Sequence, residues 1–315
     1  MSTIQRESVV TERGTRSLTQ LLRFLRQPGV PLWIPYVFIT PFFIIFAVFM
    51  LYPIVDTLVL SFENWSTVQS TWVGIQNYRL VITDPAFWTS LLNDAFILLI
   101  QVPFMLFIAT LLAVALNARF LKLKWLFRLL IFFPVLVDAV TYTIAFQLIF
   151  NPSFGMMNYL LHLVGLPSIN WIGNSWAARL AIFLVVTWRW TGYNAIIILS
   201  GLQNIPEEVY ESAVVDGAGR VRTFFQITLP LLRPVILFCT ILSTVGTLQL
   251  FTEPYILTGG GPGNATETPM LYLYNIGFQN YNFGLASAGT YILTTIIAIL
   301  SYFQIRVSRG GDYSA

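Results

Sequence analysis

Ionisable residues inside long apolar segments are the first candidates for chemistry in this chain. There are five of them: Asp56, Asp94, Asp138, Arg189 and Glu253. A charged group at the depth of a bilayer is costly, so such residues are functional candidates by default. A membrane-embedded enzyme would need a clustered catalytic set, and a zinc site would need companions for His162, the sole histidine. The sequence offers neither pattern, and we assign Asp56 and Asp94 to structure.

The residues around Arg189 suit binding better than catalysis. Trp188 and Trp190 flank the arginine, and Tyr193 and Asn194 follow it. Polar side chains can bond the hydroxyls of a sugar, and aromatic faces can cover its apolar ring faces. Other apolar segments carry further residues of suitable chemistry: Asp138, Gln147, Gln249 and Glu253. These nine residues form the candidate substrate-binding set.

The same residues could instead hold helices together. Asp138 lies near the middle of its apolar segment and Arg189 about ten residues into its own, so the two could pair. They could also face a second membrane subunit. The sequence leaves these alternatives open.

The longest polar interruption in the second half of the chain, residues 205–230, suits docking. It is predicted to form a short helix, a glycine turn and a second short helix. Asn204 and Glu207 are spaced as a capping box, Gly217 can end a helix in the left-handed conformation, and Pro230 opens the next apolar run. The turn carries small side chains: Ser212, Ala213, Gly217 and Ala218. Small side chains let another protein approach closely.

Composition places the chain in a lipid bilayer. The 315 residues are 56% hydrophobic and 10% charged, with a mean hydropathy of +0.72, whereas about 25% of the residues of a soluble protein are charged. Six apolar segments are long enough to span: 33–60, 92–116, 126–150, 180–202, 231–257 and 283–305. The predicted fold is therefore an all-α integral membrane protein with six transmembrane helices. Prolines 35, 41, 53, 103 and 134 predict kinks.

Basic residues fix the expected orientation. Of the 17 Lys and Arg, only Arg79, Arg179 and Arg189 lie away from the two tails, the loop after the second segment and the central loop. The positive-inside rule puts both termini and the central loop in the cytoplasm. Residues of about 61–91, 151–179 and 258–282 are expected outside. The net charge of +3 is thus a topology signal and gives no reason to expect a nucleic-acid partner.

The central loop resembles the "EAA" loop of membrane permeases of binding-protein-dependent ABC importers. The match is Glu211-Ser212-Ala213, Gly217, Ile227 and Leu229-Pro230, with Ser212 in place of the usual alanine. Asp216-Gly217-Ala218 and Phe224 resemble the sugar-importing branch. Residues 258–262 and the outer loop 151–166 add weaker support, and the likeness covers about residues 33–306.

The resemblance implies a type I ABC importer permease fold and a sugar substrate, either a disaccharide or an oligosaccharide, moved by alternating access. It implies four kinds of partner: a second homologous permease, two ATPase subunits, an extracytoplasmic solute-binding protein and the bilayer of a bacterial or archaeal cytoplasmic membrane. Residues 204–230 would couple to the ATPase. The coupling residues carried over are Glu208, Glu211, Ser212, Ala213, Asp216, Gly217, Ala218, Phe224 and Pro230. Domain boundaries are expected at 1–31, 32–306 and 307–315.

No cofactor is expected, and ATP would be bound by the partner subunits. The glycine run at 259–263 has no following Lys-Ser/Thr and no preceding strand, so it predicts a turn and not a phosphate loop. Two alternatives remain. A member of the same family could import glycerol-3-phosphate or a glycerophosphodiester. A secondary transporter or channel would not need residues 205–230.

Overall fold

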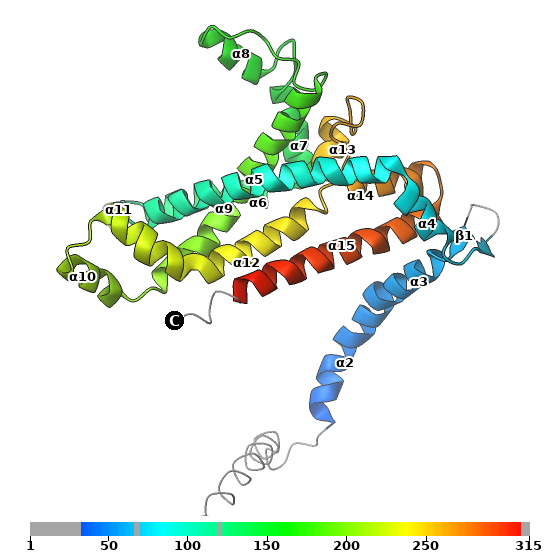
Figure 1. Ribbon diagram of the computed structural model, residues 1–315, viewed down its shortest axis with the longest axis horizontal. Helices are drawn as coiled ribbons and strands as arrows, with labels where there is room; N and C mark the ends of the chain where they lie inside the picture. Colours follow the sequence, from blue (N-terminus) through cyan, green and yellow to red (C-terminus); the bar gives the residue numbers. More distant parts are fainter. Residues whose placement is uncertain (1–32, 66–69, 119–120, 310–315) are drawn as a thin grey trace, which may run out of the picture. The chain divides into compact units, whose positions relative to one another are not determined.

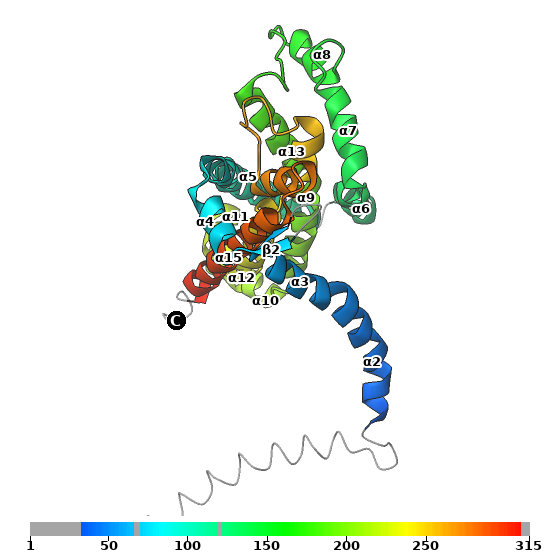
Figure 2. The same ribbon diagram turned by 90° about the vertical axis from the view of Figure 1, so that its right-hand side faces the viewer.

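The computed structural model describes residues 33–65, 70–118 and 121–309 (Figures 1 and 2). The predicted tail 1–31 lies outside these residues. The predicted C-terminal tail begins within a helix, because α15 (Phe283–Arg309) continues past residue 306. The chain divides into two compact units, Met1–Val59 and Leu60–Ala315, and we describe each by itself.

The described part of the first unit is one long helix with a widened turn. It consists of α2 (Ile34–Phe46), the π-helical η1 (Ala47–Leu51) and α3 (Tyr52–Leu60). Pro53 has no N–H, and its ring would press on the carbonyl four residues back in a regular α-helix. The backbone N–H of Tyr52 bonds the carbonyl of Ala47 instead, five residues back. The proline thus widens the turn before it.

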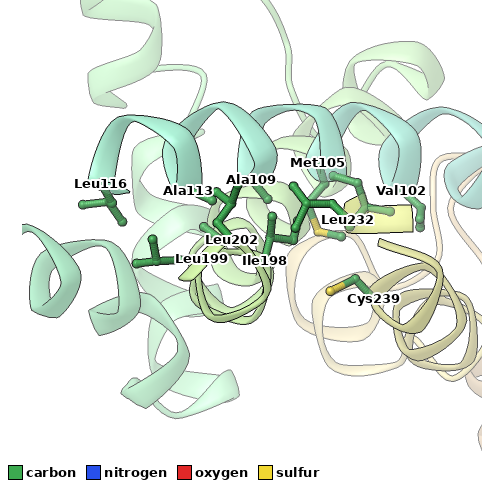
Figure 3. Close-up of a cluster of buried hydrophobic side chains, with 12 residues drawn as sticks. Val102, Met105, Ala109, Ala113, Leu116, Ile198, Leu199, Leu202, Leu232 and Cys239 are labelled. Atoms are coloured by element: carbon green, nitrogen blue, oxygen red, sulfur yellow. The ribbon is translucent and has the colours of Figure 1, made fainter. Parts of the chain in front are cut away.

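The core of the second unit lies between α5 (Pro85–Asn117), α9 (Ser175–Gln203) and α12 (Leu229–Thr247). Figure 3 shows the apolar cluster that joins them. In α5 its residues recur three or four apart: Val102, Met105, Leu106, Ala109, Ala113 and Leu116. This spacing puts them on one face of the helix, where they meet Ile198 and Leu202 of α9 and Leu232 of α12.

The third apolar segment, expected over 126–150 with a kink at Pro134, is divided into two helices. Helices α6 (Lys124–Leu136) and α7 (Ala139–Ile149) meet at 95°. Pro134 removes one N–H near the end of α6, and Val137 is extended. The Asp138 carboxylate then caps α7 by accepting bonds from the amides of Val140 and Thr141. Among the described residues five helices could cross a membrane, or six spans if the bent pair counts as one.

The fifth segment also differs from the expected 231–257. The helix starts earlier, with α11 (Arg220–Thr223) and the π-helical η2 (Phe224–Thr228) running into α12. It stops at Thr247, and α13 (Thr252–Leu257) follows a break. The carbonyl of Leu250, freed at this break, accepts a bond of 2.6 Å from the Thr268 hydroxyl. A side chain from a later segment therefore holds the interruption in place.

Short elements occupy the stretches that the sequence analysis treated as loops. They are β1 (Glu63–Trp65) paired antiparallel with β2 (Ser70–Trp72), α4 (Gln76–Thr83), α8 (Met156–Leu163), α14 (Pro269–Tyr274) and the π-helical η3 (Asn275–Gln279). Helix α8 lies at the tip of the arm formed by α7, far from α10 (Glu207–Val215) in both views (Figures 1 and 2).

The glycine-rich turn after α13 is tied down by two side chains from the core. The Asn93 amide donates to the carbonyls of Asn264 at 2.7 Å and Glu267 at 3.1 Å. The Arg179 guanidinium donates to the carbonyl of Ala265 at 2.9 Å and to the Asn93 side-chain oxygen at 3.0 Å. Helices α5 and α9 thereby fix the turn, which agrees with the expected turn at 259–263.

We expect a carboxyl in this turn to make the stability of the protein depend on pH. Burial of the Glu267 carboxyl raises its pKa above the usual 4.5; the hydrogen bond from Asn275 opposes the rise, and the charge of Asp84 adds to it. A raised pKa means that the folded protein favours the protonated carboxyl. The resulting stabilisation is complete below the pKa that the carboxyl has in the unfolded chain, and it is lost as the pH rises through the pKa that it has in the folded protein. We therefore expect the unfolding temperature of the detergent-purified protein to fall as the pH rises above 4.5.

Glu267→Gln is expected to flatten that slope, because glutamine stays neutral. Glu208→Gln, at an exposed position on α10, should keep the wild-type slope. Parallel slopes for Glu267→Gln and the wild type would contradict the assignment.

Candidate functional site

The predicted docking helix is present as α10, but its start differs from the prediction. Asn204 ends α9, and the cap of α10 is Pro206, without a side-chain cap bond. The expected capping box between Asn204 and Glu207 is therefore wrong. Ile205 precedes a proline and is therefore disfavoured in the α region, which agrees with a helix that begins after Pro206. Glu207 and Glu208 then occupy the first turn, where acidic side chains favour the helix dipole.

The end of α10 is as predicted. Gly217 has a left-handed φ of +73°. Its N–H bonds the carbonyl of Val214 at 3.0 Å, and the N–H of Ala218 bonds the carbonyl of Ala213 at 2.9 Å. These two bonds form a Schellman motif, which needs a left-handed residue between them. The glycine turn is thus set by the local sequence.

We call residues 207–218 the docking surface. Val214 and Val215 on it are 73% and 86% exposed. Polar and small members of the predicted set are also exposed: Glu208, Glu211, Ser212, Asp216 and Gly217. Ala213 is buried, which makes it an anchor of the helix and not a contact, and Ala218 is half-buried. An apolar tip with polar neighbours fits a protein interface.

A groove of about 1050 Å³ lies beside the docking surface. It is lined by Tyr210 and Glu211 of α10, by Phe224 of η2 and by the ends of α5 and α9. Phe224 is half-buried and packs edge-on against Phe225. Pro230 is exposed in the first turn of α12. The predicted coupling residues therefore gather at one end of the second unit.

Part of the predicted substrate-binding set lines a small cavity, which we call the binding cavity. Its volume is about 70 Å³, and it lies between α5, α9 and α12. Trp190, Tyr193 and Asn194 come from the predicted set. Its other polar lining residues are Gln101, Ser243 and Thr247, which the sequence reasoning missed. An amide in the middle of an apolar helix was the signal that could have identified Gln101.

Two side-chain oxygens in the binding cavity lack partners. The Asn194 amide nitrogen donates to the carbonyl of Trp190 at 3.0 Å, and the Gln101 amide nitrogen donates to the Met105 sulfur at 3.3 Å. The carbonyl oxygens of both side chains are buried and accept no bond among the described residues. Buried polar atoms are normally bonded, so these two oxygens are among the exceptions in the part of the chain that the structure describes.

Three more residues of the predicted set, Gln147, Arg189 and Glu253, form a second cluster at the two helix breaks. The Arg189 guanidinium donates to the carbonyl of Val137 at 2.8 Å and lies 4.5 Å from the centre of the Tyr142 ring. The Tyr142 hydroxyl donates to the buried Glu253 carboxylate of α13. Gln147 of α7 donates to the carbonyl of Ile256 at 3.1 Å. These contacts connect α9 to both broken segments.

The three remaining residues of the predicted set, Trp188, Gln249 and Asp138, make none of these hydrogen bonds to α13 or to the carbonyl of Val137. Trp188 packs against Tyr142 and Phe146. Gln249 is exposed in the break after α12. Asp138 caps α7, so the structure gives Arg189 a backbone carbonyl as its partner where the sequence suggested Asp138. Asp94, assigned to structure, is fully buried with no hydrogen-bond partner among the described residues.

Arg189→Met is expected to lower the free energy of unfolding by about 1.5–3 kcal/mol, because it removes a charged donor from the Val137 carbonyl at the break. Thermal unfolding in detergent measures the loss. Exchanging the charges, Asp138→Arg with Arg189→Asp, should give no rescue, since an aspartate cannot donate to a carbonyl. Recovery of stability in the double variant would instead support a direct ion pair.

Comparison with known proteins identifies the family. Residues 30–310 match the family described as binding-protein-dependent transport system inner membrane component. The chain is 39% identical over 301 residues to the lactose transport system permease protein LacF of Rhizobium radiobacter, covering 94% of this chain and 99% of that protein. It is 35% identical to the arabinooligosaccharides transport system permease protein AraP of Halalkalibacterium halodurans, covering 95% and 94%.

A solved structure shares the fold. It is the crystal structure of a bacterial alginate ABC transporter in complex with an alginate pentasaccharide-bound periplasmic protein. The TM-score is 0.77 at 21% identity, over 90% of this chain and 96% of that one. At this identity the likeness describes the architecture alone.

Proposed function

The chain belongs to the family of binding-protein-dependent transport system inner membrane components, and on this premise we propose that it is the permease subunit of an ABC importer for a sugar. The relatives named for lactose and arabinooligosaccharides support a disaccharide or oligosaccharide as substrate. The chain would supply half of the path through the membrane and would carry no ATPase activity of its own.

The observation that carries the proposal is the docking surface. Its apolar tip, Val214 and Val215, is exposed beside the left-handed Gly217, and a polar rim with Glu211 surrounds it. Such a tip suits a cleft on a separate ATPase subunit, which would bind and hydrolyse ATP. Glu211 would make a polar contact there, and Gly217 would permit the turn.

The partners follow from the same proposal. They are a second homologous permease, two ATPase subunits and an extracytoplasmic solute-binding protein. The chain is a multi-pass membrane protein of an inner-membrane family. We further propose a bacterial or archaeal cytoplasmic membrane with both termini inside, which the distribution of the 17 Lys and Arg supports.

The binding cavity is our candidate for the sugar site. At about 70 Å³ it is smaller than the roughly 300 Å³ or more of a typical ligand pocket, so it would have to open during transport. Parting of α9 from α12 would widen it, because Trp190 and Asn194 lie on one helix and Ser243 and Thr247 on the other. Alternating access would supply that movement.

The test is sugar-stimulated ATP hydrolysis by the complete importer reconstituted in liposomes. We expect at least one disaccharide to stimulate ATP hydrolysis and to be taken up into the liposomes. Both activities should be lost without ATP. Stimulation by glycerol-3-phosphate or a glycerophosphodiester alone would replace the sugar with another solute of the same family. Uptake that persists without the ATPase subunits would favour a channel or a secondary transporter.

A further inference from the structure

We propose that the start of α6 binds an anionic phospholipid. The lipid phosphate would lie at Lys122 and Arg128, and an acyl chain would lie along an exposed apolar stripe of the helix. The stripe consists of Trp125, Leu129, Phe133 and Leu136. This inference goes beyond the proposed function, because it concerns a lipid and not the transported solute.

The segment that leads into α6 carries positive charge without compensation along the chain. No Asp or Glu occurs among residues 95–137. The stretch contains four basic residues, of which Arg119 lies outside the described residues: Arg119, Lys122, Lys124 and Arg128. They lie on the proposed cytoplasmic side, where anionic lipids attract basic segments next to a membrane helix. A negative headgroup is therefore the complementary partner.

Two of these cations are available for a phosphate. Lys122 is exposed and forms no hydrogen bond or ion pair among the described residues. The Nε of Arg128 is buried, but its two terminal nitrogens keep accessible surface and also form no bond there. Guanidinium groups suit phosphate recognition. Lys124 differs, because its Nζ donates to the carbonyl of Asn117 at the end of α5, at 3.3 Å.

The apolar stripe begins beside these cations. Its four side chains are 49–66% exposed, from Leu129 to Trp125. They follow one another at intervals of four, four and three residues, which places them along one side of the helix. Another side of α6 is already packed on α9, where the backbone of Ile131 lies against Gly192. The stripe is thus a free apolar face on a helix that is held in place.

The length of the stripe matches one leaflet of a bilayer. From Trp125 to Leu136 an α-helix rises about 16 Å. The hydrocarbon part of one leaflet is about 15 Å thick, half of the roughly 30 Å core. The helix ends at Leu136, just before the 95° break. Trp125 lies at the basic end, where a tryptophan of the membrane interface is expected.

The combination favours a lipid over a protein partner. A basic loop alone would satisfy the positive-inside rule, and an apolar face alone would suit a neighbouring helix. Here unpartnered cations stand at one end of an uncharged stripe whose length equals that of the acyl chains. That order matches the phosphate and the chains of a single phospholipid.

Photolabelling of the permease–ATPase complex in phosphatidylcholine nanodiscs tests the inference. One probe is phosphatidylglycerol with a diazirine in one acyl chain, added as a trace, and the other is phosphatidylcholine with the same chain. Mass spectrometry of peptic peptides locates the label. We expect phosphatidylglycerol to label residues 125–136 at least about tenfold more than phosphatidylcholine does.

Variants connect the labelling to the two cations. Lys122→Gln combined with Arg128→Gln should lower labelling by phosphatidylglycerol about tenfold or more, since each cation near an anionic lipid contributes about fivefold. Arg233→Gln combined with Arg306→Gln is the matched control, because it removes the same charge from exposed positions on α12 and α15. Unchanged labelling by phosphatidylcholine in every variant shows that the fold is retained.

Four results would overturn the inference. Equal labelling by both probes would exclude selection of the headgroup. No labelling of residues 125–136 by either probe would mean that a protein, such as a second permease, covers the stripe. Equal losses in the two double variants would show a general attraction of anionic lipids to basic surfaces. Loss of the label in excess inorganic phosphate, against chloride at the same ionic strength, would show a site for free phosphate. None of these results bears on sugar-stimulated ATP hydrolysis, so the proposed function is tested separately.

Discussion

Gly217→Asp is expected to reduce sugar-stimulated ATP hydrolysis by the reconstituted importer about 30-fold or more. The residue has a φ of +73°, and a Cβ added there would meet no atom within 4 Å. Aspartate is among the few residues that adopt this conformation readily. Any L side chain is nevertheless strained at this φ, so only the part of the loss that exceeds the loss in a control with the same strain would come from a partner that approaches the turn closely. A hot-spot position near the centre of an interface contributes about 2 kcal/mol or more, which corresponds to about 30-fold.

Gly165→Asp is a matched control for this substitution. Gly165 has a φ of +76° and the same open surroundings, but it follows α8 at a place remote from the docking surface. Hydrolysis in this variant should equal that of the wild type. Equal activity of both variants would mean that residues 207–218 do not couple the chain to an ATPase. An equal loss of ATP hydrolysis in both variants would mean that strain in the left-handed backbone, and not an interface with a partner, causes the loss.

Gly192→Ala is expected to lower the free energy of unfolding by about 3 kcal/mol or more. A Cβ at this position would overlap the carbonyl oxygen of Ile131 and lie 2.7 Å from its carbonyl carbon. Both atoms belong to the backbone of α6, so no side chain can turn aside to make room. Overpacking of this kind costs about 1–3 kcal/mol and sometimes more. Thermal unfolding of the detergent-purified protein measures the loss.

The comparison variant is Gly246→Ala. A Cβ there meets nothing within 4 Å, and the residue lies in the last turn of α12. Replacing glycine by alanine where space and backbone permit stabilises by about 0.4–1 kcal/mol. A similar stability for both variants would show that α6 moves freely away from α9, contrary to the close packing described here.

Local chemistry made the docking end predictable. Gly217 ends α10 as expected because a Schellman turn depends on a few adjacent residues. The failed cap at Asn204 has an equally local cause, since Pro206 disfavours the α region for Ile205. The six apolar segments were recognisable because hydropathy summed over about 20 residues is a strong signal.

Tertiary contacts set the rest. Pro134 predicted a kink in the third segment, but neither a proline nor hydropathy gives a bend angle, so the sequence did not predict a 95° break between α6 and α7. Arg189 was identified as important, but its partner is a backbone carbonyl, which sequence composition cannot reveal. Gln101 was not in the predicted set, although Gln147 and Gln249 were, because the sequence does not show which amides lie where α5 meets α9 and α12.

The π turn ahead of Pro230 has a consequence for helical phase. The N–H of Leu229 bonds the carbonyl of Phe224, five residues back, so η2 holds one residue more than a regular α-helical turn. Each residue of an α-helix turns the chain by about 100°. The extra residue therefore rotates α11, and the chain that leads back to the docking surface, by about that angle relative to the buried stripe of α12. Pro230 widens this turn. It thereby sets the angle between the buried face of α12 and the direction in which α11 leads back to the docking surface.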